Sequence, residues 1–308
     1  MDRAAYLGLQ RDPAAWRSIV VEVSAAAGVP CDEVRAFGDC ANLVAAVGAH
    51  VVKLFPPFHR HQWQSERVGL RHFAGRLPVR VPQRIADGER GDGWCWMVQE
   101  LVPGVPLEQR WAAAAQPERG RLLEQIGGLM RVAHALPVGE AAALAPEWGA
   151  FLLGQRNACV ARHHRLGAPA WLLRDIPRLL DEWASRLAAD PRRVALTGEY
   201  TPFNLLVGDA GGLQLQSMID FGDTMVGVPE YDLLGPSLFL CGGEAELVAA
   251  LLRGYHGADL SMTQELRMRL MTLAVMHRYA NFELQVRIDR WWDRSRSLEQ
   301  LAELIWPA

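Results

Sequence analysis

The chain divides into a strand-rich first third and a helical remainder, and this asymmetry limits the folds open to it. Short runs rich in valine and alanine occur over 34–55, and a further strand is predicted over 94–101 before Pro103. Beyond that proline the long segments have helical periodicity, at 117–135, 147–165, 170–188, 243–255 and 262–287. We therefore expect an α+β protein with a small β-rich lobe over residues 1–102 and a larger, mainly helical lobe over 103–308.

The composition excludes several classes of protein. There are 32 Lys+Arg against 35 Asp+Glu, and the basic residues are dispersed, so we expect no nucleic-acid partner. The scattered cysteines lack a Cys-x-x-Cys pair, which argues against a zinc knuckle or a disulfide framework. No apolar stretch approaches the roughly 18 residues of a membrane span, and the first residues lack a signal-peptide pattern. We expect a cytoplasmic protein, a monomer or a homodimer, with no membrane partner.

One segment of the helical lobe carries the groups that phosphoryl transfer requires. Glu199 is followed five residues later by Asn204. A strand pair predicted over 204–207 and 213–219 then leads to Asp220. Phosphoryl transfer needs a carboxylate beside the acceptor hydroxyl and oxygen ligands for Mg²⁺ on the nucleotide phosphates. Alone, the asparagine is also typical of a turn and Asp-Phe-Gly recurs by chance, but their joint order is more specific. We expect Glu199 to be catalytic, and Asn204 and Asp220 to bind Mg²⁺.

A nucleotide-binding lobe should then lie upstream, and two charged residues suit it. Lys53 follows a predicted Val51-Val52 strand, where kinases place the lysine that contacts the α- and β-phosphates. Glu66, in a helix predicted over 62–75, is its expected ion-pair partner. Taken singly, a solvent-facing lysine and a surface helix charge explain the same residues. The downstream motif favours the functional interpretation of both.

Further nucleotide contacts are expected from a loop and from a hinge. Gly38 and Asn42 occupy the place of a phosphate-covering loop, although the loop lacks a G-x-G-x-x-G pattern. Gln99, Glu100 and Val102 lie where a hinge would present backbone N–H and C=O groups to an adenine. A plain strand end followed by a turn explains the same letters. The expected nucleotide is ATP, with GTP left open.

These residues together resemble the aminoglycoside phosphotransferase and choline kinase-like family, which has a bilobal, protein kinase-like fold. Its pattern His-Gly-Asp-x-x-x-x-Asn followed by Ile-Asp-Phe maps onto residues 197–204 and 219–221. Residues 227–233 resemble its Gly-Asp-Pro-x-x-Asp-Leu segment. Looser matches at 52–55 and 251–254 are most similar to hygromycin B phosphotransferases. The resemblance covers nearly the whole chain.

The chain departs from the family pattern at two positions of the catalytic centre. Thr197 replaces the family histidine, and Glu199 replaces its aspartate. The longer side chain places the carboxylate one methylene further from the backbone, and a shift near ~1 Å costs on the order of a hundredfold in rate where nothing compensates. The carboxylate chemistry is retained, so we expect an altered pocket. The resemblance also implies that Asp232 braces the catalytic loop.

The resemblance places the acceptor between the catalytic loop and the C-terminal helices. Acidic side chains there would suit a cationic acceptor, and aromatic faces suit the apolar side of a sugar ring. Solvated helix charges and core packing are commoner explanations for such residues. Interleaved arginines at 287, 290, 294 and 296 leave room for a neutral or acidic acceptor. The expected acceptor contacts are Asp223, Glu283, Trp291 and Trp292.

The resulting hypothesis is an ATP-dependent phosphotransferase that acts on a hydroxyl of a small molecule. The first acceptor to consider is an aminoglycoside such as hygromycin B, which would make the enzyme an antibiotic-resistance kinase. Two alternatives stay open: a kinase for a metabolite such as choline, homoserine or a sugar, and a catalytically impaired nucleotide-binding homologue. Glu199 separates the impaired homologue from the enzymes, because only an enzyme loses turnover when this carboxylate is removed.

Overall fold

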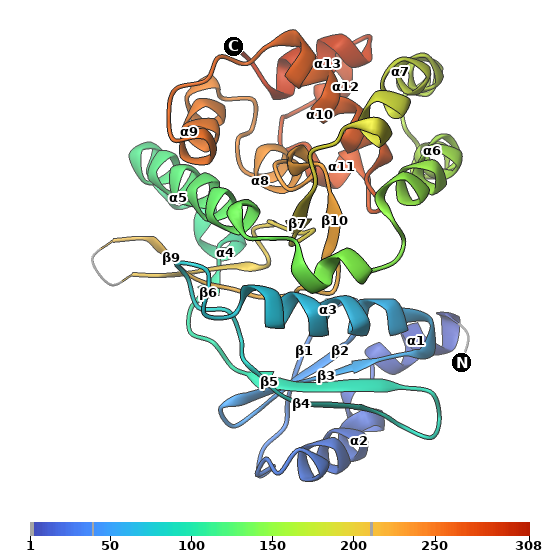
Figure 1. Cartoon of the computed structure of the whole chain (residues 1–308), viewed down its shortest axis with the longest axis vertical. Coiled ribbons are helices and arrows are strands. Elements are labelled where there is room, and N and C mark those ends of the chain that lie inside the picture. The colour runs from blue at the N-terminus through green and yellow to red at the C-terminus, as the bar shows by residue number, and fades with distance from the viewer. Residues whose placement is uncertain (1–2, 39, 210–211) are drawn as a thin grey trace.

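An antiparallel sheet organises the N-terminal lobe (Figure 1). The computed structural model describes residues 3–38, 40–209 and 212–308. The sheet has the strand order β1-β2-β3-β5-β4, and each neighbouring pair is antiparallel. Its strands are β1 (Arg35–Phe37), β2 (Leu43–Val47), β3 (His50–Phe55), β4 (Arg84–Glu89) and β5 (Cys95–Glu100).

The hairpin predicted within 34–55 is confirmed as β2 and β3. Val47 pairs with His50, so that the two residues between them form a tight turn. Gly48 begins this turn with φ at +56°, a conformation that glycine adopts without steric cost. Lys53 lies on the central strand β3, where it pairs with Met97 of the neighbouring strand β5.

Helices cover both faces of this sheet. On the outer face lies α2 (Pro13–Ala26), which buries Trp16 and Val20 against strand residues, and α1 (Arg3–Gln10) adds Tyr6 to the same core. The helix predicted over 12–27 is thus α2, whereas the sequence pattern does not predict α1. On the other face, α3 (Arg60–Phe73) lies between the sheet and the helical lobe (Figure 1). Its apolar side belongs to the large core shared with the C-terminal helices, so α3 joins the two lobes.

The C-terminal lobe is mainly helical and encloses short strands. None of its described helices, nor those of the N-terminal lobe, combines the length and apolar character that crossing a membrane requires. The helices are α4 (Glu108–Trp111), α5 (Gln116–Ala135), α6 (Trp148–Arg165), α7 (Ala170–Ala189), α8 (Leu234–Phe239), α9 (Ala245–His256), α10 (Gln264–Met276), α11 (Phe282–Gln285), α12 (Trp291–Arg294) and α13 (Leu298–Ile305). The strands are β6 (Val105–Pro106), β7 (Val194–Leu196), β8 (Leu205–Gly208), β9 (Gln214–Met218) and β10 (Met225–Gly227). Single 3₁₀ turns occur at Pro57–His59, Gly139–Ala143 and Pro229–Tyr231.

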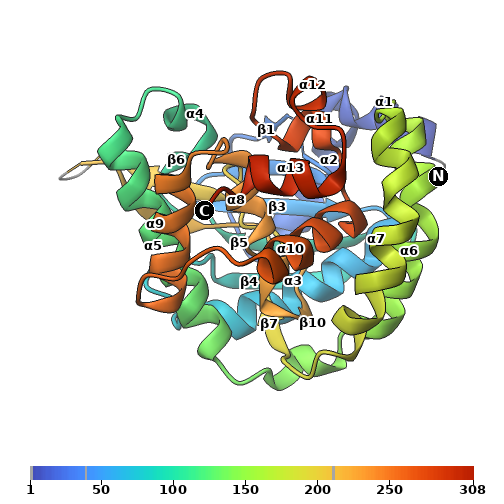
Figure 2. The ribbon, with the colours of Figure 1, turned by 90° about the horizontal axis from the view of Figure 1, so that it is seen from above.

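Two glycines let α5 and α9 pack backbone against backbone, side by side in Figure 2. A Cβ at Gly127 would lie 2.2 Å from the carbonyl oxygen of Leu251, and one at Gly254 would lie 2.1 Å from that of Glu124. Any side chain at either position would force the helices apart. The packing of α9 against α5 holds α5 in place, and α5 in turn contacts β7.

The helix predicted over 262–287 is wrong in its second half. α10 ends at Met276, and His277 turns to extended backbone with ψ at 138°. The chain then passes Asp223, whose carboxylate accepts hydrogen bonds from Arg278 and Tyr279, before α11 begins. These tertiary bonds override the continuing helical pattern. The interruption places residues 277–281 along the cleft.

Candidate active site

A cleft of about 1080 Å³ lies between the sheet and the helical lobe. Lys53 lines it from β3, while Glu199, Asn204 and Asp220 line it from the helical lobe. Pockets for one small ligand occupy roughly 300–1,000 Å³. The cleft therefore has room for a nucleotide with an acceptor beside it.

Lys53 lies between two carboxylates, one fully buried and one half-exposed. Its Nζ lies 2.5 Å from Oε1 of Glu66 on α3 and 3.3 Å from Oδ1 of Asp220. Glu66 is fully buried, and this burial raises the pKa of Glu66 to about 7, although Lys53 opposes the shift. Burial lowers the pKa of Lys53, but attraction to Asp220 and Glu66 outweighs it, so the net shift is upward. Lys53 therefore stays positively charged at neutral pH and can hold phosphate oxygens.

The loop between β7 and β8 brings the three motif residues together. Nδ2 of Asn204 donates a hydrogen bond to Oε2 of Glu199 at 3.0 Å. The main-chain N–H of Ile219 donates to the carbonyl oxygen of Asn204 at 2.9 Å, which ties the loop to the segment carrying Asp220. Asp220 itself adopts φ of +65°, a conformation uncommon outside glycine. The structure thus brings together Glu199, Asn204 and Asp220, the three residues that the sequence spacing selects.

Asp232 braces this loop, as the resemblance implies. Its two carboxylate oxygens accept main-chain N–H bonds from Thr197 and Gly198, each at 3.0 Å. His134 of α5 reaches the same carboxylate, with Nε2 3.1 Å from Oδ2, and its Nδ1 lies 3.0 Å from the hydroxyl of Tyr255. An imidazole from a distant helix therefore supports a loop in which threonine replaces the family histidine. No sequence pattern points to this histidine, because it acts across 98 residues of chain.

The carboxylate of Glu199 is desolvated and lies near two other carboxylates. Burial raises its pKa well above the usual range, and repulsion by Asp223 and Asp220 acts in the same direction. Asp223 is also buried, and its carboxylate accepts hydrogen bonds from Nη1 of Arg278 at 2.6 Å and from the hydroxyl of Tyr279 at 3.2 Å. Asp223 is thus bound by two side chains of the protein itself. Neither Arg278 nor Tyr279 carries a sequence signal of this pairing.

The residues expected to contact the nucleotide lie on the N-terminal side of the cleft. Glu66 is fully buried and does not line the cleft; it contacts Lys53, which does. The hinge is tied to the sheet, because the N–H of Leu101 donates to the carbonyl oxygen of Ala49 at 2.9 Å. The cleft lining includes Gly38, Asn42, Gln99, Glu100 and Val102.

Three of the expected acceptor residues lie elsewhere. Glu283, Trp291 and Trp292 line a second cavity of about 270 Å³, which adjoins the cleft through Asn281. Trp291 is 3% exposed and packs edge-on against Phe282, at 6.0 Å between ring centroids. Its indole is therefore largely core. These three residues do not line the cleft that contains Glu199.

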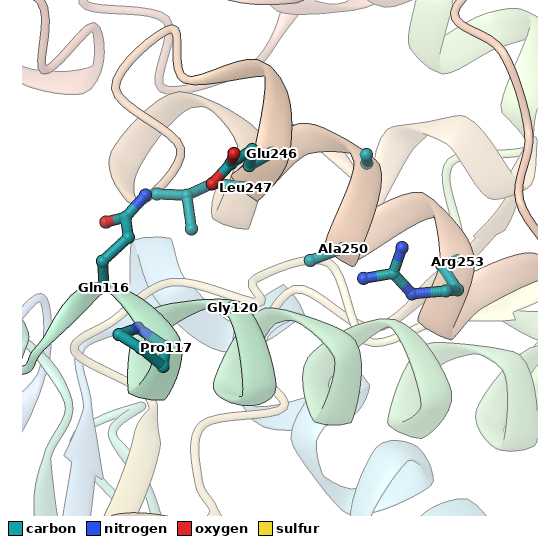
Figure 3. A pocket seen from close by; sticks show the side chains of 8 residues that line it. Gln116, Pro117, Gly120, Glu246, Leu247, Ala250 and Arg253 are labelled. Carbon is teal, nitrogen blue, oxygen red and sulfur yellow. The ribbon is translucent and has the colours of Figure 1, made fainter.

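A third hollow, of about 400 Å³, lies between α5 and α9 (Figure 3). Small and apolar side chains such as Ala250 line its middle. Gln116 and Glu246 lie at one end and Arg253 lies at the other (Figure 3). Nε2 of Gln116 already donates to Glu244 at 2.7 Å. This hollow contains none of the motif residues.

Asp220 and Asn204 are suited to hold Mg²⁺. In the described part of the chain, no three or more His, Cys, Asp or Glu side chains group as a metal cage. Mg²⁺ on a nucleotide needs no such cage, because it is bound by one or two protein oxygens, by substrate phosphates and by water. A half-exposed carboxylate and a neighbouring amide on the cleft surface fit that donor set.

Comparison with known proteins supports the fold. Three solved structures share the fold. The GDP complex of wild-type aminoglycoside 2′-phosphotransferase-IIIa is 19% identical, with a TM-score of 0.63, and the match covers 90% of this chain and 93% of that one. The ternary complex of APH(2″)-IIa with streptomycin and ATP is 14% identical, with a TM-score of 0.62 and coverage of 91% and 96%. Macrolide 2′-phosphotransferase MphH from Brachybacterium faecium is 19% identical, with a TM-score of 0.57 and coverage of 94% and 98%.

The sequence itself identifies the family. At 14–19% identity, the likeness to the three structures establishes the fold, which is protein kinase-like and bilobal. A family model described as the phosphotransferase enzyme family, APH, matches residues 34–269, which is well over half of the 308 residues. That match contains both the lysine strand and the complete catalytic loop. The chain therefore belongs to the APH phosphotransferase enzyme family.

Proposed function

We propose that this protein transfers the γ-phosphoryl group of ATP to a hydroxyl group of a small molecule. An antibiotic is the first acceptor class that we propose, and a metabolite is the alternative. One observation carries the proposal: the Lys53–Asp220 pair and the Asn204–Glu199 pair meet on one surface of the cleft. That arrangement supplies a cation for phosphate oxygens, oxygen ligands for Mg²⁺ and a carboxylate for the acceptor. The division into a nucleotide lobe over 1–102 and an acceptor lobe over 103–308 is part of the proposal.

In this mechanism Glu199 positions the acceptor hydroxyl and accepts its proton. The acceptor oxygen forms a bond to the γ-phosphorus while the bond from that phosphorus to the β,γ-bridging oxygen breaks, and ADP leaves. Lys53 holds phosphate oxygens, and Glu66 keeps Lys53 in place. Mg²⁺, held by Asp220 and Asn204 when bound, would neutralise charge on the phosphates. Asp232 fixes the loop, so the carboxylate of Glu199 is already positioned for the acceptor before it binds.

The adenine is proposed to bind along the hinge at Gln99, Glu100 and Val102, with Gly38 and Asn42 near the phosphates. Structural neighbours were solved with ATP or with GDP, which supports a purine nucleotide and keeps GTP as an alternative donor. The resemblance makes an aminoglycoside such as hygromycin B the first acceptor to test. One structural neighbour was solved with streptomycin and another is a macrolide phosphotransferase, which supports an antibiotic acceptor more broadly.

The test is transfer from γ-labelled ATP with Mg²⁺ to separate panels of antibiotics and metabolites, the second containing choline, homoserine and sugars. Label on an antibiotic, together with reduced susceptibility of host cells that express the protein, is the expected result. Label on a metabolite alone would replace the antibiotic assignment with the metabolite alternative. ATP binding without transfer to any acceptor would contradict phosphotransfer and support the impaired homologue.

A further inference from the structure

We infer that the acceptor half of the cleft binds a hydroxylated molecule with a large apolar face and at most one positive charge, rather than a polycation. The inference rests on the proposed phosphotransfer and narrows its acceptor. It concerns the surface formed by Phe203, Leu238, Phe239, Leu284 and Arg287, which we call the acceptor wall. This wall lies in the helical lobe, on the same cleft as Glu199.

The acceptor wall presents apolar side chains to solvent inside the cleft. Phe203 is 46% exposed and Leu284 is 62% exposed. The ring of Phe203 meets that of Phe239 edge to face, at 5.9 Å between centroids. Large apolar side chains left open in a concave site are favourable contacts for a ligand that covers them. A fully hydrated sugar amine would gain little from this surface.

The charges of this half of the cleft nearly cancel. Glu108 lines the cleft, but its Oε1 lies 3.3 Å from Nη2 of Arg287. The guanidinium of Arg287 also lies over the Phe239 ring, at 5.8 Å, so the wall carries its own cation. Asp232 is buried and binds the catalytic loop.

Two further carboxylates of the helical lobe do not face the acceptor as free charges. Asp223 is neutralised by Arg278 at 2.6 Å, and Glu283 lines the second cavity. Asp220 also lines the cleft, but it is assigned to Mg²⁺ and lies 3.3 Å from Nζ of Lys53. Among the described residues of the acceptor half, Glu199 is thus the carboxylate left to face an acceptor. A polycation needs several such groups, since each buried ammonium without a partner costs free energy. A single carboxylate without a basic partner instead matches a neutral or singly charged acceptor.

The test compares an amphipathic probe with a polycationic one on the full chain with Mg²⁺ and ATP. Erythromycin A, a macrolide with several hydroxyls and a single amine, represents the first class, and kanamycin A represents the second. We expect kcat/KM to be at least a hundredfold higher for erythromycin. Equal or higher kcat/KM for kanamycin would overturn the inference.

The inference and the proposed function can fail separately. If neither probe is phosphorylated, the acceptor class is tested by the binding of each probe to the protein loaded with a non-hydrolysable ATP analogue. Tighter binding of erythromycin would sustain the acceptor class while contradicting phosphotransfer, whereas tighter binding of kanamycin, or of neither, would overturn the acceptor class. Loss of ATP binding itself would contradict the nucleotide site.

Variants of the acceptor wall provide the residue-level test. Leu284→Ser should lower kcat/KM for erythromycin by about tenfold, through KM, because the probe loses the contact of a whole leucine side chain. The KM for ATP should not change. Leu153→Ser, at a similarly exposed leucine on α6, is the matched control and should behave as wild type. Arg287→Gln frees Glu108 and should strengthen kanamycin binding in a salt-sensitive manner. Equal effects of Leu284→Ser and Leu153→Ser would count against the wall.

Discussion

Replacement of Lys53 by methionine separates the charge of this lysine from its bulk. Methionine fills much of the space of the lysine stem but leaves the carboxylate of Glu66 without its ammonium partner, which lies 2.5 Å away. Breaking a buried pair by removing one partner costs about 3–5 kcal/mol of unfolding free energy. The full cost applies only while Glu66 remains ionised.

The loss should therefore depend on pH. Burial already raises the pKa of Glu66 to about 7 in the presence of Lys53, against an ordinary value of 4.5. Without Lys53 the pKa of Glu66 rises further, because the attraction that favoured the ionised form is gone. A raised native pKa stabilises the fold at pH values below the unfolded pKa, and this contribution is lost as pH rises through the native pKa. Lys53→Met should thus cost about 4 kcal/mol near pH 8.5 and less than about half of that near pH 6.

The assay is urea unfolding followed by tryptophan fluorescence at both pH values. The control is Lys53→Met/Glu66→Gln, which lacks the Glu66 carboxylate whose raised pKa causes the pH dependence, and it should show a pH-independent difference from Glu66→Gln. Binding of a fluorescent ATP analogue, measured in parallel, should weaken in both variants that lack the lysine. An equal loss of stability at the two pH values would refute the buried pair as described.

Three further predictions concern the scaffold around the catalytic loop. Gly127→Ala should destabilise the protein by about 1–3 kcal/mol because its Cβ meets a carbonyl oxygen of α9, whereas Gly128→Ala, with open space at the same helix, should be neutral or stabilising in thermal unfolding. His134→Ala should lower kcat and Tm and leave the Kd for ATP unchanged, since it removes a support of Asp232; an unchanged kcat would deny it that role. Gly198→Ala combines φ of +88° with a Cβ only 2.4 Å from a carbonyl oxygen, so it should abolish turnover in a steady-state assay, and retention of wild-type kcat would show that the loop is not constrained.

The division of the fold was predictable because local periodicity determines it. The helices predicted over 117–135, 147–165 and 170–188 match α5, α6 and α7 closely, since each carries a long apolar stripe. The short strands β7 and β10 were not predicted, because three-residue strands leave no periodic signal. The false continuation of α10 has a tertiary cause, the hydrogen bonds of Asp223.

The candidate site was predictable where its residues occur in a fixed order along the chain. Lys53 and Asp220 were selected from motif and context, and the fold places them 3.3 Å apart. The support from His134 was not predictable, because its partner is brought near by helix packing alone. The acceptor residues were the least predictable part. Trp291 and Leu284 belong to neighbouring short helices, and only the packed structure distinguishes the one in the core from the one in the cleft.

The most direct measurement of the central claim is the rate of phosphate transfer from γ-labelled ATP with Mg²⁺ by wild type, Glu199→Gln and Asp220→Asn, alongside ATP binding by each. We expect product with wild type and a loss of at least about a hundredfold with Glu199→Gln, whose ATP binding remains intact. Asp220→Asn should lose transfer and weaken Mg²⁺-dependent ATP binding. Transfer by Glu199→Gln at the wild-type rate would contradict the assignment of Glu199 as the group that takes the acceptor proton.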